Sequence, residues 1–578
     1  MKQVVRQAKR LKAGSVRTVG RARHSDVKVR QALSLAVSHI EPLEQRRYLS
    51  VTTNAQGWTV VTPSADSRMI YVSNSTGSDS NSGLSPTAPL QTIGKGLTLL
   101  RTGFPDELLL KRGDTFSTSI YFNNSGRSAQ EPMLISYYGD NSLPRPVIDG
   151  GTVTAMSGGT LIKYLDIIGV DFTSSTHDPT SPNFNNQGNY GFFDLGTMDS
   201  LLIEDCRFRN FIEGIVIQAT PTLYGPISNV TLRRNEVIDC YTTNGNSQGM
   251  YAEGVNGLTM DQNIFDQDGW SQLVPGATAN TFSHDVYIQS SCTNCVFTNN
   301  IFADAASHGL QARGGGLVQG NLFLNDAAGF SFGLVNGATT HPGGVSGQVT
   351  GNVVLGSANG VNGGLGIELG NLMPGGNTVV SNNIVADAPS IQVNPAIWLS
   401  PGLGVANPQQ EVGLNSLTFS NNVVYHWGWG LFVSESFLPG TTGADALSGV
   451  VISNNRFDSM YASRVVNQAI PYDPRYEDLS GNTYYYNSST QPLFEYASPS
   501  TAAGNQYYLP TGGWVAGIEP TASLSATQFV DPTRNIDSYM ASIGLTGGTA
   551  AYLALIDNFN EQNWNPILMP AAVNPAWM

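Results

Sequence analysis

Histidine, tyrosine and arginine side chains stand at matching places in short, similar segments from the middle of the chain. His284 and Tyr287 lie in HDVYIQ, while His308 and Arg313 lie in HGLQAR and Tyr251 in QGMYAE. Elimination or epimerisation at a uronic acid needs a cation for the carboxylate, a base for the neighbouring proton and an acid for the leaving oxygen. We predict Arg313 as the cation, His284 or His308 as the base, and Tyr287 or Tyr251 as the acid. The alternative is a solvated polar ladder that only coats the fold.

The element that must position these residues is a strand that recurs along the chain. A phrase of alternating apolar and polar residues ends in Asn, any residue, and Phe or Val, as in LTMDQNIF, CVFTNNIF and VVISNNRF. Its Asn recurs with a shortest step of 21 residues, from Asn300 to Asn321, and Cys206 takes the Asn place in a looser copy. Such repeats bury their apolar face by stacking, so we predict an all-β, right-handed parallel β-helix with an asparagine ladder at one bend.

A second short strand follows each phrase, as in GMYAE, GLQAR, GIELG and AIWLS. Its second and fourth residues are apolar and are predicted to face the core, so the third and fifth are predicted to face solvent. Stacked strands lie ~4.8 Å apart. The alignment therefore places His284 above His308 and Tyr251 beside Tyr287.

The outward positions also carry residues that we expect to contact a substrate. Gln311 and Trp398 occupy the third position, and Gln289 and Glu253 occupy the fifth. The alignment places Glu253 two coils from Arg313. Trp398 points outward beside an aromatic residue of the next coil and is predicted to form a platform for a sugar ring. Its alternative role is to be covered by the C-terminal segment.

The repeats divide the chain into four parts. We expect a basic targeting segment at 1–50, an N-terminal cap at 51–150, the β-helix at 151–490 and a C-terminal cap or tail at 491–578. The N-terminal cap is predicted to contain a helix that plugs the core, and two short helices of the last part are predicted to cover or flank the other end. One face of the N-terminal helix carries these apolar residues: Leu90, Ile93, Leu97 and Leu100.

Charge and composition exclude several functions. The 578 residues carry a net charge of −14, and the 48 Asn outnumber all the basic residues. Residues 1–50 hold 12 Lys and Arg against 3 acids, which leaves an acidic body with 17 basic and 40 acidic residues. Such a body is a poor nucleic-acid binder, because phosphates need clustered cations. No apolar run reaches the ~18 residues of a membrane span, four cysteines make no disulfide scaffold, and we expect a monomer.

The end of the basic segment, IEPLEQRRYLSV, resembles the LEPR-type N-terminal motif of exported bacterial proteins. The resemblance implies a secreted or cell-surface protein whose mature form begins near Val51. The alternative is a basic tail without a targeting function.

The segments DVYIQSSCTNCVFTNNIF and SHGLQARGGGLVQGNLF resemble the chondroitinase B and alginate lyase group. In this resemblance Arg313 occupies the family's arginine place and Asp285 that of an acidic residue tied to calcium, the one cofactor suggested. The chain departs from the family where a catalytic lysine is expected, since it has Gln289 or Ser290 there, and Gly314 follows the arginine instead of His.

The resemblance implies a carbohydrate-active protein, a lyase or C5-epimerase with an acidic polysaccharide as its partner. The alternative is a non-catalytic cell-surface or adhesive β-helix protein, which the acidic body favours. A polygalacturonase-type hydrolase is a further alternative, but SHG at Ser307–Gly309 is the only echo of its motifs, and the paired carboxylates of its acid/base chemistry are missing.

Overall fold

The structure is a computed structural model. The chain divides into two units, Met1–Leu49 and Ser50–Met578. The predicted targeting segment falls almost wholly in the first unit and lies outside the described residues. The described residues are 50–219, 225–334, 340–358, 363–388, 394–402, 411–435, 446–458, 460, 465–485, 494–496, 506–508, 518–525 and 534–577.

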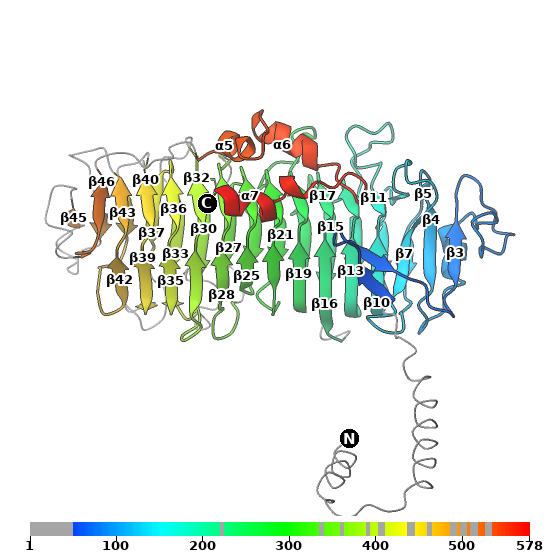
Figure 1. Ribbon diagram of the computed structural model, residues 1–578, viewed down its shortest axis with the longest axis horizontal. Coiled ribbons are helices and arrows are strands. Elements are labelled where there is room, and N and C mark those ends of the chain that lie inside the picture. The colour runs from blue at the N-terminus through cyan, green and yellow to red at the C-terminus, as the bar shows by residue number, and fades with distance from the viewer. Residues whose placement is uncertain are drawn as a thin grey trace, which may run out of the picture. The chain divides into compact units, whose positions relative to one another are not determined.

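Three sheets, each of 14 strands within these residues, enclose one core. Their outermost strands are β3 (Met69–Val72) and β42 (Glu477–Ser480) in the first sheet, β5 (Thr115–Ser117) and β46 (Ser523–Ser525) in the second, and β6 (Ile120–Phe122) and β45 (Gln506–Tyr508) in the third. From β4 (Glu107–Lys111) to β44 (Phe494–Tyr496), each circuit of the chain adds one parallel strand to each sheet, whereas β45 follows β44 directly and is antiparallel to it. This is the right-handed parallel β-helix that the repeats predict (Figure 1).

The middle coils carry the residues predicted to do chemistry. Their strands in the first sheet are β16 (Ile227–Arg233), β19 (Val255–Asp261), β22 (Val296–Thr298), β25 (Gly316–Gln319) and β28 (Gly347–Thr350). Those in the second sheet are β17 (Glu236–Ile238), β20 (Ile264–Asp266), β23 (Ile301–Ala303), β26 (Leu322–Leu324) and β29 (Val353–Leu355). Those in the third sheet are β15 (Glu213–Gln218), β18 (Gln248–Glu253), β21 (His284–Ile288), β24 (His308–Ala312), β27 (Ala328–Phe332), β30 (Leu365–Gly370) and β33 (Pro395–Ser400).

Alternate residues of each third-sheet strand fill the core. Val286 and Ile288 of β21 lie directly beside Leu310 and Ala312 of β24, and all four are fully buried. The predicted inward positions are therefore confirmed. The four cysteines are buried free thiols, among them Cys206, which begins the asparagine ladder.

The ladder runs along the bend between the first and second sheets. In one rung, the side-chain amide of Asn321 donates to Asn352 Oδ1 at 3.0 Å and to the carbonyl of Phe297 at 2.9 Å. Its own Oδ1 accepts from the backbone and side-chain N–H groups of Asn300 at 2.9 and 3.0 Å. Every polar group of the buried amide is thus satisfied. The ladder extends one coil beyond the predicted one, to Asn482.

The N-terminal helix is shorter than predicted. Helix α3 (Ile93–Leu97) begins after Thr92, whose hydroxyl accepts a hydrogen bond from the backbone of Lys95. Leu90 lies before the helix and pairs with the strand residue Val72. Leu90 and Ile93 are nevertheless buried in the core, as the plug requires.

The C-terminal helices do not cover the end of the β-helix, contrary to the prediction. Helices α5 (Ile536–Ala541), α6 (Gly548–Ile556) and α7 (Pro570–Trp577) lie along the outside of the second sheet (Figure 1). The reason is that outward positions of this sheet are apolar, which a solvated sheet would not tolerate. The buried cluster between helices and sheet includes Ile264, Ile301, Leu322, Val353, Ile384, Tyr539, Tyr552 and Ile556.

Replacing Asn321 by Ala is expected to destabilise the fold severely. The change leaves the Phe297 carbonyl and the Asn300 donors buried without partners, each at a cost of ~1–3 kcal/mol. Chemical denaturation of the two proteins checks the loss. Asn256→Ala is the matched control, because Asn256 makes only exposed hydrogen bonds, to Thr293 and Asn294. Equal losses in the two variants would contradict the role of the ladder.

Stability is expected to fall as pH rises, because of buried carboxyl groups such as Glu107 of β4 (Glu107–Lys111). Burial raises the pKa of Glu107 from 4.5 to about 7. A carboxyl with a raised folded pKa stabilises the fold fully below its ordinary pKa, and that contribution is lost as pH rises through the folded pKa. Melting temperatures measured between roughly pH 4 and pH 8 should decline, and Glu107→Gln should flatten the decline. The exposed Asp478→Asn is the control, and an unchanged slope in Glu107→Gln would refute the assignment.

Candidate functional site

The predicted site lies on the outer face of the third sheet, on strands β18, β21 and β24. Tyr251 is in register with Tyr287, and Tyr287 with Gln311, as the alignment predicts. His284 and His308 lie in adjacent coils with ring centroids 5.3 Å apart. The structure therefore brings the predicted histidines and tyrosines together in one patch.

The imidazole of His308 is engaged at both nitrogens. Its Nε2 lies 2.6 Å from Glu368 Oε2, and its Nδ1 lies 3.0 Å from the hydroxyl oxygen of Ser307. A carboxylate can only accept, so Nε2 carries a proton, while the direction of the Nδ1–Ser307 hydrogen bond depends on the protonation of the ring. Glu368 is a member of the site that the sequence interpretation missed, although its third position in GIELG placed it in the outward column.

His284 is held neutral. Its Nδ1 accepts the backbone N–H of His308 at 3.3 Å, and its side chain is buried beneath the ring of Tyr287, 5.1 Å away between centroids. Burial lowers the pKa of His284 well below its ordinary value, and the charges of His308 and Arg313 add to this effect. A neutral ring whose Nδ1 accepts carries its proton on Nε2, so His284 is a hydrogen-bond donor toward a ligand.

Gln289 links the two tyrosines. Its amide donates to the hydroxyl of Tyr251 at 3.3 Å and to that of Tyr287 at 3.2 Å. Tyr251 in turn donates to Glu253 Oε2 at 2.8 Å, which also receives the amide of Gln218 at 2.6 Å. Burial raises the pKa of both tyrosines, so both keep their protons at neutral pH. The Tyr287 hydroxyl proton has no acceptor among the described residues.

Arg313 is a buried cation without a carboxylate partner in the part of the chain that the structure describes. Its guanidinium lies over the ring of Tyr287, 4.6 Å from the centroid, and its side chain is 5% exposed. Its Nε and Nη1 atoms have no hydrogen-bond partner there. Glu253, which the alignment placed two coils away, bonds to Tyr251 instead. A buried charge without a partner costs free energy that an anionic ligand would return.

The outward positions are less exposed than predicted. Gln311, Ser331 and Glu368 all occupy the third position of their strands, yet 7%, 1% and 3% of their surfaces are exposed. They point away from the core but pack against one another and against His308, so the column forms a second, polar interior. The Gln311 and Ser331 side-chain oxygens lack partners among the described residues.

Trp398 lies on β33, in register with Glu368 and with Phe432 of the following coil. The Trp398 and Phe432 rings are tilted by 34° with centroids 6.4 Å apart, and both side chains are half-buried. The described C-terminal helices lie on the second sheet, so they do not cover Trp398. The predicted platform stays a prediction.

Asp285 lies in the interior between the second and third sheets. Its carboxyl group accepts from the backbone N–H groups of Asp268 and Ala303 at 3.3 and 3.2 Å, and burial raises its pKa well above the ordinary value. These neighbours are hydrogen-bond donors, whereas calcium needs several oxygen ligands. Among the described residues no group of three or more His, Cys, Asp or Glu is arranged to hold a metal ion. Calcium dependence stays a prediction of the sequence.

No family model and no curated protein matches the chain. Solved structures are similar to it at low identity. A GH136 lacto-N-biosidase from Eubacterium ramulus is 12% identical with a TM-score of 0.34, and the match covers 87% of this chain and 72% of the lacto-N-biosidase chain. An alginate lyase from Paenibacillus sp. str. FPU-7 is 15% identical with a TM-score of 0.34, covering 70% and 98%. A rhamnogalacturonan lyase is 11% identical with a TM-score of 0.38, covering 84% and 92%.

None of the described helices combines the length and the apolar character needed to cross a membrane.

His284 is expected to stay neutral far below pH 6.5, with its proton on Nε2. Nitrogen-15 NMR of protein labelled at histidine distinguishes this tautomer and follows its titration. Arg313→Gln should raise the pKa of His284 without restoring it to its ordinary value, because burial is the larger cause of the shift. His341→Gln is the control, because His341 is half-buried and is not among the groups that shift the pKa of His284. Titration of His284 near pH 6.5 would contradict the assignment.

Proposed function

We propose that the protein binds an acidic polysaccharide on the outer face of its third sheet, with the carboxylate of one uronic acid on Arg313. The observation that carries the proposal is the buried guanidinium with two unpaired nitrogens. A planar guanidinium matches a carboxylate with two parallel hydrogen bonds, and burial strengthens such a pair. The half-buried tyrosines beside Arg313 supply surface for a sugar ring.

The same groups support a lyase or C5-epimerase reaction. Arg313 neutralises the carboxylate, so the proton on the adjacent C5 becomes more acidic. Both imidazoles are engaged at their basic nitrogens, so we place the base at Tyr251, whose hydroxyl passes its own proton to Glu253 as it takes the proton from C5. Tyr287 acts as the acid, because its hydroxyl proton has no acceptor among the described residues and can be donated to the substrate.

The two outcomes differ in where the Tyr287 proton goes. In elimination, the electron pair left at C5 forms the C4=C5 double bond, the C4–O4 bond breaks, and Tyr287 protonates the leaving oxygen. In epimerisation, Tyr287 returns a proton to C5 on the opposite face and the glycosidic bond stays intact. His284, neutral and protonated at Nε2, donates a hydrogen bond to the substrate in both cases.

A second candidate function is non-catalytic glycan binding at the cell surface. The engagement of both imidazoles favours it, since neither His284 nor His308 has a ring nitrogen ready to accept a proton. Both candidates are consistent with a secreted or cell-surface protein, which we propose on the basis of the N-terminal resemblance, and with the expected monomer. They share the Arg313 contact and differ only in turnover.

The proposal is tested with alginate, pectate and glycosaminoglycans. Ultraviolet absorbance detects an unsaturated product, NMR detects inversion at C5, and calorimetry detects binding. We expect one polymer to bind and to be converted, and Arg313→Gln to lower kcat/KM by about 100-fold or more. Arg475→Gln is the matched control, because its side chain is 73% exposed and pairs with Asp473.

Tyr287→Phe separates catalysis from binding. It keeps the ring beneath Arg313 and removes the hydroxyl, which takes away the donated proton and the hydrogen bond from Gln289, so kcat should fall while KM changes little. Binding without any product in the unaltered protein would establish the non-catalytic alternative. Absence of binding to all three polymers, or activity that survives Arg313→Gln, would refute the proposed function.

A further inference from the structure

A pocket of about 430 Å³ lies beside the turns that leave strands β20, β23 and β26 of the second sheet. Its volume is in the range of small-ligand sites. None of the groups assigned to the acidic-polysaccharide site lines it. The pocket borders that site through Ala306, which is followed by Ser307 and His308.

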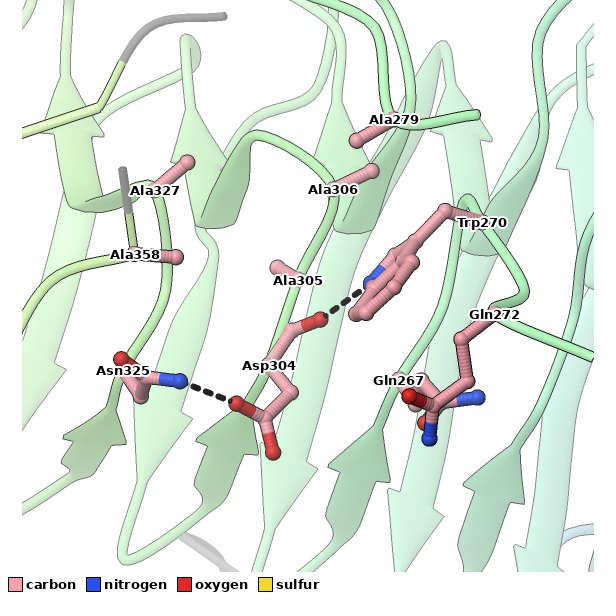
Figure 2. Close-up of a pocket in the computed structure, with 10 residues that line it drawn as sticks. All are labelled: Gln267, Trp270, Gln272, Ala279, Asp304, Ala305, Ala306, Asn325, Ala327 and Ala358. Atoms are coloured by element: carbon pink, nitrogen blue, oxygen red, sulfur yellow. Dashed lines mark hydrogen bonds between the residues drawn. The ribbon is translucent and has the colours of Figure 1, made fainter. Parts of the chain in front are cut away.

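The pocket combines an aromatic wall with a floor of small side chains. The indole of Trp270 projects over Ala305 and Ala306 (Figure 2). Its Nε1 donates to the main-chain carbonyl of Asp304 at 2.7 Å, which holds the ring in one orientation. Alanine side chains leave room in front of the ring. A fixed aromatic face beside open space is suited to stacking on the apolar face of a pyranose.

Polar groups line the rest of the pocket. Asp304 Oδ1 accepts the amide of Asn325 at 2.6 Å, while Gln267 and Gln272 lie on the same side as Trp270 (Figure 2). Carboxylate and amide groups together accept from and donate to neighbouring hydroxyls. The Asp304–Asn325 hydrogen bond fixes these polar side chains, as the Trp270 hydrogen bond fixes the indole. The side chains therefore lose little conformational freedom when a ligand binds.

The charge of the pocket selects against acidic sugars. The lining residues that the structure describes include Asp304 but no Lys, Arg or His. Asp239 lies close by, within 3.2 Å of the Gln267 amide. Burial raises the pKa of Asp304, and the hydrogen bond from Asn325 opposes this shift. A uronate carboxylate would meet like charge here and no cation among the described lining residues, in contrast to the Arg313 site.

We propose that this pocket binds an uncharged pyranose residue, stacked on Trp270 with its hydroxyls on Asp304 and Asn325. The inference goes beyond the proposed function, since it requires neither Arg313 nor turnover. If both the Arg313 site and the Trp270 pocket bind sugars as proposed, the protein recognises glycans that contain neutral as well as acidic sugars.

Saturation-transfer NMR with the full chain tests the pocket. The probes are the methyl pyranosides of galactose, glucose, mannose and xylose, with methyl glucuronide as the charged comparison. We expect at least one neutral probe to bind with Trp270 protons close to its apolar face. Trp270→Ala should weaken that binding by about tenfold or more, and Asp304→Ala should weaken it as well. Trp270→Phe keeps a ring and should retain part of the affinity, which guards against loss of the fold as the explanation.

Matched controls separate this pocket from the acidic-polysaccharide site. Trp429→Ala removes another half-buried indole and should leave binding of the neutral probe unchanged, as should Arg313→Gln. The pocket is refuted if no neutral probe binds, if binding survives Trp270→Ala, or if glucuronide binds there as tightly as the neutral sugars. If only Arg313→Gln abolishes binding of the neutral sugar, the sugar binds at the Arg313 site, and the proposal for the Trp270 pocket is also refuted.

Discussion

The side-chain ladder of asparagines is the interaction on which the rest of the structure depends. Each amide donates to the next rung and to the coil behind it, as Asn321 does toward Asn352 and Phe297. The turn between the first and second sheets can therefore repeat only at the spacing of hydrogen-bonded strands. Because all coils share that spacing, residues at equal strand positions form straight columns. The candidate site is one such column, read along the third sheet.

The two buried polar systems of the molecule differ in completeness. The ladder satisfies its amides fully, and this is the condition under which buried polar groups stabilise a fold. The outer column of the third sheet leaves some of its buried polar atoms without hydrogen-bond partners among the described residues. Arg313 and Gln311 keep unpaired polar atoms in the described structure, while His308 and Glu368 pair across two coils. Other buried polar atoms of the described residues also lack hydrogen-bond partners, among them those of Asp194 and Glu236, but Arg313 is a cation, and its cost is one that binding an anion would offset.

Sequence reasoning predicted the periodic features and missed the aperiodic ones. The period-2 alternation and the recurring Asn were enough to place Tyr251 beside Tyr287 and to predict the ladder. The His308–Glu368 contact spans two coils and depends on side-chain reach, which no repeat encodes. The ladder's last Asn, Asn482, was missed because its phrase, EDLSGNTY, has little of the apolar alternation. The path of the C-terminal helices depends on which outward face is apolar, a property visible only after the three sheets are assigned.

The C-terminal helices also set an order on how the molecule is made. The amide of Asn574 in α7 donates to the carbonyls of Gly320 and Asn321, which precede it by 254 and 253 residues. Glu561 bonds through its backbone to Asp205, 356 residues earlier. Coils can stack as they emerge from the ribosome, because each needs only its neighbour. The apolar outer face of the second sheet, however, must wait for the last part of the chain to be synthesised. Until then the growing β-helix exposes an apolar flank, which the helices between Ile536 and Trp577 cover.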